Sequence, residues 1–367
     1  YHLQQTANTM SSPRSVIAQA ATEKRHATWQ ETLQQAKKKH RPKLADWTRD
    51  GFATRRRTEV ERLDAIPKCA LRITRVDAGI APDDFATRFE RRSEPCLVTN
   101  VPEREGWALR NWTSINGRPT NRGDLDVFRM KVGEDDDGKT VRVSLRDFVS
   151  YARFNRDDSP LYVFDQAFCE KHGRDFYSIP KFCARDDLFE LVGEARRPPY
   201  QWFLLGPQRS GTCVHIDPLG TAAWNTLLAG RKRWVLFEPG TSKKVATGSQ
   251  LVKPGEDDEA VNYFVDILPR IRATYPHARR IEVVQRPGDT LYVPAGWWHA
   301  VLNLDDTVAV TQNFVSRSAF DGAWDRTRSG RKGMARAWLA KLEGADDPEL
   351  RALAARAKLQ PPVPRIV

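Results

Sequence analysis

A dense series of short strands between residues 201 and 316 constrains the fold of this chain more than any other feature. Each segment is rich in β-branched or aromatic residues, and turns such as Gly206-Pro207 and Pro287-Gly288 separate neighbouring segments. The expected strands are residues 201–205, 222–228, 232–237, 280–284, 290–294, 300–304 and 307–314. Many short strands with turn punctuation are typical of a sandwich, jelly roll or barrel. One charge-rich insertion, at about residues 241–279, interrupts the series.

Helical patterns flank this β core, so we expect a mainly β protein with α segments. Four regions are expected: a basic, partly helical N-terminal extension (1–75), an α/β region that packs on the core (76–200), the β core (201–316) and C-terminal helices (317–367). Further expected elements are helices at 28–38, 82–90 and 143–154 and strands at 71–77, 96–101 and 161–165.

Two amphipathic helices are expected in the C-terminal region. The apolar stripe of the first helix consists of Ala335, Trp338, Leu339 and Leu342. Asp347 can cap the second helix, which has Pro348 at its first position, where a missing N–H costs nothing. These stripes pack on their own domain or mediate a homodimer, and the sequence leaves both alternatives open.

The chain is basic, with 59 Lys and Arg against 47 Asp and Glu, for a formal net charge of +12. Such an excess favours polyanionic partners or acidic peptides, although it also serves solubility alone. Two basic runs, at 37–43 and 55–57, indicate either a solvated face or a segment for nuclear import or RNA contact. Acidic loops at 133–137 and 255–259 offer local docking points for a basic partner.

Cysteine usage and hydropathy point to a reducing compartment without membrane insertion. The five cysteines are widely spaced, odd in number and form no CxxC pair, which argues against a disulfide framework and a zinc–thiolate site. The sequence contains no run of about 18 apolar residues, so no transmembrane helix is expected. No apolar stretch follows the start, so no secretory signal is expected.

The strand-rich region also holds a candidate metal site. His215 and Asp217 are two residues apart in an extended segment, so both side chains project to one face. A histidine from another strand-rich segment, His299, would complete the two imidazoles and one carboxylate of non-haem Fe(II) oxygenases. Without further context, a histidine beside an aspartate is more often an ordinary hydrogen-bonded pair.

The surrounding sequence carries a family resemblance. The stretches GPQRSGTCVHIDPLGTAAWNTLLAGRKRW and PGDTLYVPAGWWHAVLNLDDTVAVTQNF resemble the two signature halves of the JmjC domain, a cupin-like double-stranded β-helix (jelly roll). RPKLADWTRD, GEDDDG, DDSPLYVFD and ARRPPYQWF extend the similarity over roughly residues 35–330. The match is to the phosphatidylserine-receptor-like branch of bifunctional lysyl hydroxylases and arginine demethylases. Nuclear residence, or otherwise cytoplasmic residence, is expected from this resemblance and from the basic runs.

The resemblance assigns roles by position. It implies that His215, Asp217 and His299 bind Fe(II), leaving positions for 2-oxoglutarate and O2, and that no catalytic residue is needed beyond the metal ligands. The implied 2-oxoglutarate contacts are Lys232, which pairs with the distal carboxylate, and Thr212, Asn225, Thr311 and Tyr162. A dicarboxylate independently calls for one cation among neutral donors. Without the motif, Lys232 would be interpreted as a surface lysine.

Three tryptophans near the motifs, Trp224, Trp297 and Trp298, are expected to pack around the iron and shield it from solvent. Cys213 is expected to be a small buried apolar residue. Gln208, Cys213 and the insertion at 241–279 depart from the family pattern, which affects substrate choice but leaves the proposed ligands intact.

The resemblance implies a protein hydroxylase dependent on Fe(II) and 2-oxoglutarate, with lysyl hydroxylation in Lys/Arg/Ser-rich protein segments favoured. Demethylation of N-methyl-arginine or N-methyl-lysine could use the same site. Two further hypotheses remain: a catalytically decayed scaffold that binds RNA through its basic N-terminus, and a small-molecule hydroxylase.

Overall fold

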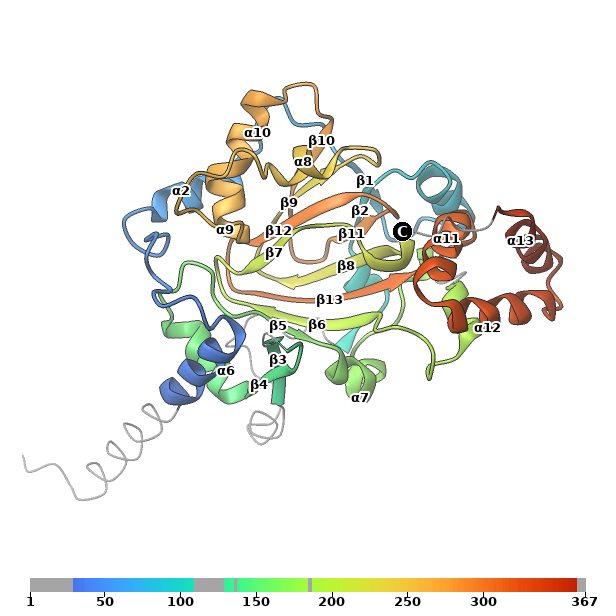
Figure 1. Ribbon diagram of the computed structural model, residues 1–367, viewed down its shortest axis with the longest axis horizontal. Helices are drawn as coiled ribbons and strands as arrows, with labels where there is room; N and C mark the ends of the chain where they lie inside the picture. Colours follow the sequence, from blue (N-terminus) through green and yellow to red (C-terminus); the bar gives the residue numbers. More distant parts are fainter. Residues whose placement is uncertain (1–28, 109–128, 135–136, 184–186, 362–367) are drawn as a thin grey trace, which may run out of the picture.

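A computed structural model describes residues 29–108, 129–134, 137–183 and 187–361. Two β-sheets face each other in the centre of the molecule (Figure 1). The larger sheet has the strand order β1-β2-β11-β8-β13-β6-β5, and the smaller one has the order β10-β9-β12-β7. A separate hairpin pairs β3 with β4.

The chain passes repeatedly between the two sheets, as in a jelly roll. In the larger sheet lie β6 (Gln201–Gly206), β8 (Ala222–Ala229), β11 (Thr290–Val293) and β13 (Thr307–Phe314). In the smaller sheet lie β7 (Gly211–His215), β9 (Lys232–Phe237), β10 (Arg280–Gln285) and β12 (Trp298–Asn303). All pairings among these strands are antiparallel. The predicted cupin-like double-stranded β-helix with helical extensions is therefore confirmed.

Elements before the barrel extend its larger sheet and cover it. The added strands are β1 (Thr74–Asp77), β2 (Cys96–Thr99) and β5 (Val163–Asp165), and the hairpin is β3 (Arg129–Glu134) with β4 (Thr140–Ser144). The helices in this part are residues 29–40, α2 (Arg57–Glu61), α3 (Pro82–Phe85), α4 (Val101–Arg104), α6 (Leu145–Phe154) and α7 (Gln166–Phe176). A single π turn, Ala86–Glu90, continues α3.

Most of the elements expected from sequence are present, with differences at their ends. The strand expected at 96–101 stops at Thr99, because Val101 begins α4, and the strand expected at 71–77 begins at Thr74. The helix expected at 143–154 begins at Leu145, because Val143 still belongs to β4 and Ser144 caps the helix by accepting a hydrogen bond from the Asp147 N–H. Strand β7 was expected only as an extended segment. The acidic loop expected at 133–137 lies partly outside the described residues.

The space between the sheets is filled by an inner apolar cluster, which lines the interior of the barrel. Both sheets contribute to it: Leu97, Ala223, Leu291 and Val293 from one, and Trp234, Leu236, Ile281, Val283 and Val301 from the other, together with Trp297. A larger cluster packs on the outer face of the larger sheet. Because both faces of these sheets are covered, every residue of β8, β9 and β13 is buried, not only the residues that face the interior.

The charged insertion covers the outer face of the smaller sheet. It forms α8 (Lys243–Thr247), α9 (Ala260–Asn262), a π turn (Tyr263–Ile267) and α10 (Leu268–Thr274). Its apolar residues Phe264 and Ile271 pack with Val235 and Leu302 of the sheet in one buried cluster. The segment that interrupts the strand pattern is therefore part of the core, because it supplies the second layer for β9, β10 and β12.

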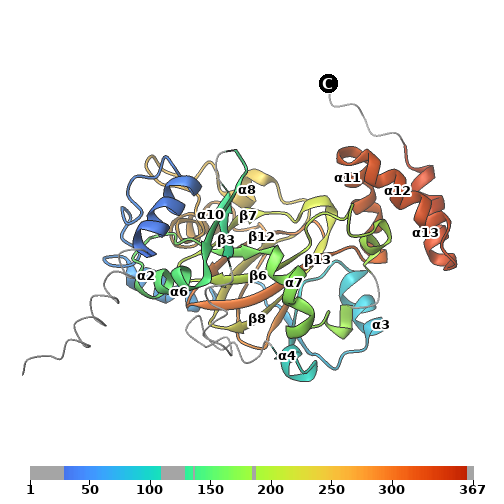
Figure 2. The same ribbon diagram turned by 90° about the horizontal axis from the view of Figure 1, so that it is seen from below.

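Three C-terminal helices, α11 (Phe320–Gly330), α12 (Lys332–Glu343) and α13 (Pro348–Leu359), form a unit set to one side of the barrel (Figures 1 and 2). Trp338 and Leu342 are fully buried against Phe189 and other residues of the same chain. Asp347 caps α13 through the Glu349 N–H, as expected. Among the described residues, no helix is both long enough and apolar enough to cross a bilayer.

The burial of Trp338 yields a stability prediction. Trp338→Ala should lower the free energy of unfolding of the C-terminal helical unit by about 3–5 kcal/mol, because a fully buried indole is replaced by a cavity. Urea unfolding followed by circular dichroism measures the change. Leu359→Ala, at a side chain that is 85% exposed in the same unit, should change it by less than about 0.5 kcal/mol. Equal effects of the two substitutions would contradict the packing.

Candidate active site

Two histidines on paired strands of the smaller sheet and an aspartate that follows one of them converge in the barrel. His215 ends β7, His299 lies directly opposite it on β12, and the two ring centroids are 4.2 Å apart. Asp217 follows β7 with an extended backbone, and its carboxylate oxygens lie 3.9 Å from the Nε2 atom of each histidine. One ligand atom from each of the three residues lies within 4.8 Å of the other two.

Backbone carbonyls set the orientation of both imidazoles. His215 Nδ1 lies 2.8 Å from the Cys213 carbonyl oxygen, and His299 Nδ1 lies 3.1 Å from that of Trp297. A carbonyl oxygen only accepts hydrogen bonds, so each Nδ1 carries the proton and each Nε2 presents a lone pair toward Asp217. Both rings are thus held in the tautomer that a metal ligand requires.

The electrostatics of this cluster suit a divalent cation. Burial, and secondly repulsion from His215, lower the pKa of His299 to about 4, so this imidazole is neutral at pH 7. The Asp217 Oδ2 atom is buried and has no hydrogen-bond partner within the described part of the chain. A buried carboxylate oxygen without a partner is costly, and a bound cation would satisfy it. Two imidazoles and one carboxylate leave coordination positions open, unlike a closed four-ligand zinc site.

Lys232 lies in the barrel interior on the neighbouring strand. Only 1% of the residue is exposed, and its Nζ atom donates a 2.8 Å hydrogen bond to the Tyr162 hydroxyl. Burial lowers the pKa of its ammonium to about 7. No carboxylate lies within ion-pairing distance of Nζ among the residues whose positions are described, so a buried cation is left for an anionic ligand. The interpretation of Lys232 as a surface lysine is therefore wrong.

Strand register places this lysine at a suitable separation from the histidines. Lys232 is opposite Asn303, and Leu236 is opposite His299. Lys232 and Leu236 are four positions apart, which corresponds to about 13 Å along an extended strand. An extended lysine side chain and a short dicarboxylate can together span this distance.

The other residues expected to contact 2-oxoglutarate also face the interior. Asn225 and Thr311 are opposite each other on β8 and β13. The Thr212 hydroxyl and the Asn225 carbonyl oxygen are buried without partners in the part of the protein that is described, while Thr311 donates to the Trp224 carbonyl oxygen. Burial raises the pKa of the Tyr162 phenol, against a smaller opposing effect of a hydrogen bond from Asn303. The phenol thus keeps a proton that it can donate.

A β-bulge brings Thr212 to the same face as His215. The register between β7 and β12 shifts between His299 and Val301, so that His215 pairs with His299 but Thr212 pairs with Val301. Regular alternation would place two residues three positions apart on opposite faces. Cys213, between these two residues, is exposed, so the expectation that it would be buried is wrong.

Asn303 is a site residue that the sequence interpretation missed. It is fully buried, donates to the Ser210 hydroxyl at 2.9 Å and has an unpartnered carbonyl oxygen as far as the described residues show. A Cβ atom on Gly206 would lie 2.1 Å from its amide nitrogen, so a glycine is required there. Asn303 follows His299 by four residues on one strand, and period-two alternation could have indicated that both face inward.

Two of the three tryptophans near the motifs do not have the expected role. Trp224 lies on the outer face of β8 and packs against Trp107, while Trp298 donates from its Nε1 to the Thr241 carbonyl oxygen on the outer face of β12. Neither can shield the metal cluster. Trp297 belongs to the inner apolar cluster, and the Trp234 ring lies 6.1 Å from that of His299. Trp234 therefore provides shielding that the sequence interpretation had not assigned.

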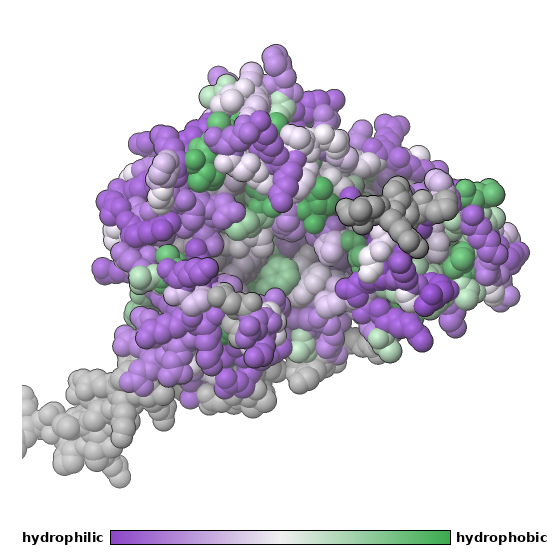
Figure 3. Space-filling model, in the orientation of Figure 1, coloured by the Kyte–Doolittle hydropathy of each residue, from purple (hydrophilic) through white to green (hydrophobic). Residues whose placement is uncertain are grey.

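The face of the molecule seen in Figure 3 is mostly hydrophilic around its edge and is hollowed near its centre, over the strands of the barrel. A cavity of about 340 Å³ is lined by Tyr162 and Thr212, and also by Glu134 and Glu259. Two acidic segments that are far apart in the sequence thus meet beside two of the expected cosubstrate residues.

Comparison with known proteins matches residues 202–314 to the JmjC domain, hydroxylase. The bifunctional arginine demethylase and lysyl-hydroxylase psr-1 of Caenorhabditis elegans is 38% identical over 280 residues, which cover 74% of this chain and 68% of that protein. Its namesake in Caenorhabditis briggsae is 38% identical over 320 residues, covering 84% and 76%. The human 2-oxoglutarate and iron-dependent oxygenase JMJD4 is 26% identical over 264 residues, covering 66% and 60%.

The barrel and these similarities define an enzyme class, the iron- and 2-oxoglutarate-dependent dioxygenases. Within this class, the chain belongs to the JmjC family, in the phosphatidylserine-receptor-like branch of its two nematode relatives.

The lowered pKa of Lys232 predicts a pH-dependent affinity for 2-oxoglutarate. Only the charged lysine pairs with a carboxylate, and its pKa in the ligand-free protein is about 7. Below pH 7 the ammonium is already present, whereas above pH 7 binding must take up a proton, so affinity should fall by up to about tenfold per pH unit. Calorimetric titration with Mn(II) present, from pH 6 to 9, measures the dissociation constant of 2-oxoglutarate. Lys232→Arg should flatten the profile, and a flat wild-type profile would contradict the prediction.

Asn303→Asp should weaken 2-oxoglutarate binding by at least about tenfold, because a carboxylate opposite Lys232 competes with that of the cosubstrate. Calorimetry measures the dissociation constant. Mn(II) affinity should stay unchanged, since Asn303 lies four residues, or about 13 Å, from His299 along β12. A loss of both affinities would indicate general disruption of the barrel instead.

Proposed function

We propose that this enzyme hydroxylates a lysine side chain in a Lys/Arg/Ser-rich protein segment, using Fe(II), 2-oxoglutarate and O2. His215, Asp217 and His299 would hold the iron. Lys232 would bind the distal carboxylate of 2-oxoglutarate, with contacts from Thr212, Asn225, Thr311 and Tyr162. The names of the two nematode relatives include lysyl-hydroxylase, which supports the choice of reaction.

The observation that carries this proposal is a carboxylate and an ammonium in one barrel that no group of opposite charge compensates, as far as the described residues show. A buried Asp217 oxygen lies near both imidazoles, and the backbone of the buried Lys232 lies about 13 Å along the neighbouring strand from the residue opposite His299. A metal ion chelated by a short dicarboxylate would satisfy both. In a catalytically decayed scaffold, these two groups would destabilise the fold without binding any ligand.

Each residue has a physical task in this reaction. When bound, Fe(II) supplies the activation of O2 that is coupled to oxidative decarboxylation of 2-oxoglutarate. Lys232 and Tyr162 orient the cosubstrate by charge and by a donated proton. Trp234 and the inner apolar cluster exclude water from the reacting centre.

The rim of the 340 Å³ cavity carries paired charges of both signs. Glu134 and Glu259 line it together with Lys131 and Arg41. Glu259 is held by Arg41 at 2.9 Å, and Glu134 pairs with Lys131. The choice of a protein substrate therefore rests on the names of the relatives and not on this rim.

Demethylation is a second candidate, because the names of the same relatives include arginine demethylase. Hydroxylation of an N-methyl carbon gives an unstable hemiaminal that releases formaldehyde, so the same residues serve both reactions. Nuclear residence, RNA contact through the basic runs and a homodimer through α11–α13 stay predictions from sequence.

Mass spectrometry of Lys/Arg/Ser-rich peptides tests the proposal directly. Incubation with Fe(II) and 2-oxoglutarate should add one oxygen atom to a peptide lysine and release one succinate for each. Asp217→Ala should reduce turnover at least about 100-fold and weaken Mn(II) binding, because a metal ligand is lost. Asp321→Ala removes an exposed carboxylate on α11 and should change neither.

The products distinguish the alternatives. Formaldehyde from a methyl-arginine peptide, without a lysine product, would assign demethylation. Absence of succinate from protein shown to bind Mn(II) and 2-oxoglutarate would support the scaffold. Succinate that depends on a small molecule but on no peptide would support the third hypothesis.

A further inference from the structure

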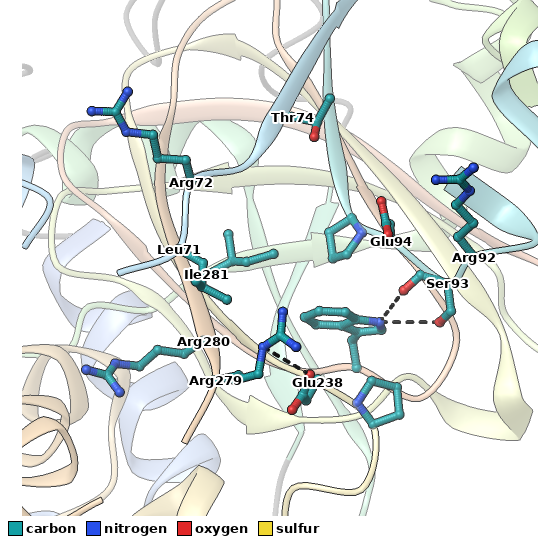
Figure 4. A pocket seen from close by; sticks show the side chains of 13 residues that line it. Leu71, Arg72, Thr74, Arg92, Ser93, Glu94, Glu238, Arg279, Arg280 and Ile281 are labelled. Atoms are coloured by element: carbon teal, nitrogen blue, oxygen red, sulfur yellow. Dashed lines mark hydrogen bonds and ion pairs between the residues drawn. The ribbon is translucent and has the colours of Figure 1, made fainter. Parts of the chain in front are cut away.

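A second cavity, of about 510 Å³, lies outside the metal cluster (Figure 4). It is formed by five short segments of the chain, which lie before β1, before β2, after β9, at the start of β10 and before β12. Its lining includes Arg72, Arg92, Glu94, Glu238, Arg279 and Trp297. None of the residues expected to bind iron or 2-oxoglutarate contributes to this lining.

Strand register places this cavity at the end of the barrel where the two histidines lie. Leu236 of β9 is opposite His299, and Glu238 follows two residues later. Trp297 precedes His299 by two residues and accepts its Nδ1 hydrogen bond. Two residues of extended chain span about 7 Å, so the cavity is adjacent to the metal cluster along both strands.

The charges on the rim are not mutually satisfied. Arg72 and Arg92 are exposed and make no hydrogen bond or ion pair with any residue whose position the structure gives. In Figure 4 they stand on opposite sides of the cavity. Arg279 has one loose contact, at 3.7 Å, with Glu238. Arg280 is buried, and its guanidinium is already used by the Ala278 carbonyl oxygen and Glu282.

An anion is the ligand that these charges favour. Three exposed arginines face two glutamates, Glu94 and Glu238, which leaves an excess of positive charge on the rim. Guanidinium groups bind phosphate and carboxylate through paired hydrogen bonds, and no described residue uses the donors of Arg72 and Arg92. The Glu94 carboxylate repels an anionic ligand. Replacing it with a neutral residue should therefore strengthen anion binding, whereas replacing an arginine should weaken it.

Trp297 gives the cavity a rigid apolar wall. Its Nε1 atom donates to the Ser93 carbonyl oxygen at 2.9 Å, which fixes the indole, and only 9% of the residue is exposed. A volume of this size accommodates a side chain together with neighbouring backbone. A peptide segment therefore fits the cavity better than a lone ion does.

We propose that this cavity binds an anionic side chain, a phosphoserine or an acidic residue, of the protein segment that the enzyme modifies. This inference rests on the proposed function. The cavity lies about 7 Å from the metal cluster, and the target lysine must also extend its side chain toward the metal. Together these distances place the anionic residue roughly two to four residues before or after the target lysine in the peptide. It also answers an electrostatic difficulty, because a chain of net charge +12 repels a purely basic segment.

Fluorescence anisotropy with the full chain tests this without turnover. The probes are labelled Lys/Arg/Ser-rich peptides with a single target lysine and with serine, phosphoserine or aspartate at each of six positions on either side. Phosphoserine two to four positions from the lysine should lower the dissociation constant about tenfold relative to serine, and aspartate less, because phosphate carries more charge. The same gain at every position would overturn the proposal.

Substitutions test whether the increase in affinity caused by phosphoserine, the phosphoserine gain, arises in this cavity. Arg72→Gln and Arg92→Gln should each remove most of the phosphoserine gain, whereas Glu94→Gln should enlarge it. Arg153→Gln removes one exposed positive charge on α6 and should leave the gain unchanged. A gain that is insensitive to Arg72, Arg92 and Glu94, or equally reduced by Arg153→Gln, would overturn the proposal. All four positions are exposed, so these variants should fold.

Two further readouts identify the occupant of the cavity and separate its binding from turnover. If a labelled single-stranded RNA loses affinity on Arg72→Gln and Arg92→Gln while the phosphopeptide does not, the occupant is nucleic acid and the proposal is wrong. If the arginine-dependent phosphopeptide gain persists but no peptide is hydroxylated or demethylated, the proposed function fails while the anion site remains.

Discussion

The position of β12 between β7 and β9 is the constraint on which the rest of the site depends. Its pairing with β7 brings His299 opposite His215, and its pairing with β9 sets Lys232 opposite Asn303. One strand thus determines both the metal cluster and its separation from the ammonium. The inner apolar cluster and the packed insertion hold β12 from both faces, so the geometry exists before any ligand binds.

Burial gives this site its electrostatic character. The interior lowers the pKa of Lys232 to about 7 and that of His299 to about 4, because both lose the solvation of their charged forms. The side-chain oxygens of Asp217, Thr212 and Asn225, which find no hydrogen-bond partner among the described residues, add to the free energy that folding must offset. Ligands that satisfy these groups should therefore stabilise the fold as well as react within it.

Sequence patterns accounted for most of the architecture, and the differences have local causes. Turn residues and β-branched runs located seven of the barrel strands, while β7 is short and broken by a bulge, which weakens its alternation. The insertion carries charge on its surface, so its sequence did not indicate that Phe264 and Ile271 complete the core. Trp224 and Trp298 occur in the motifs, but alternation along β8 and β12 turns them away from the metal cluster.

The sequence by itself determined the family, the double-stranded β-helix and the candidate ligands, because motif residues and the period-two pattern are local properties of the chain. Only the tertiary structure decided which of these side chains meet and that Asn303 and Trp234 lie beside them. It also showed that Lys232 is buried with no carboxylate next to it in the described part of the chain. It also assembled the arginine-lined cavity from five distant segments. Such contacts depend on strand register and on a bulge, which are set by packing between residues far apart in the chain.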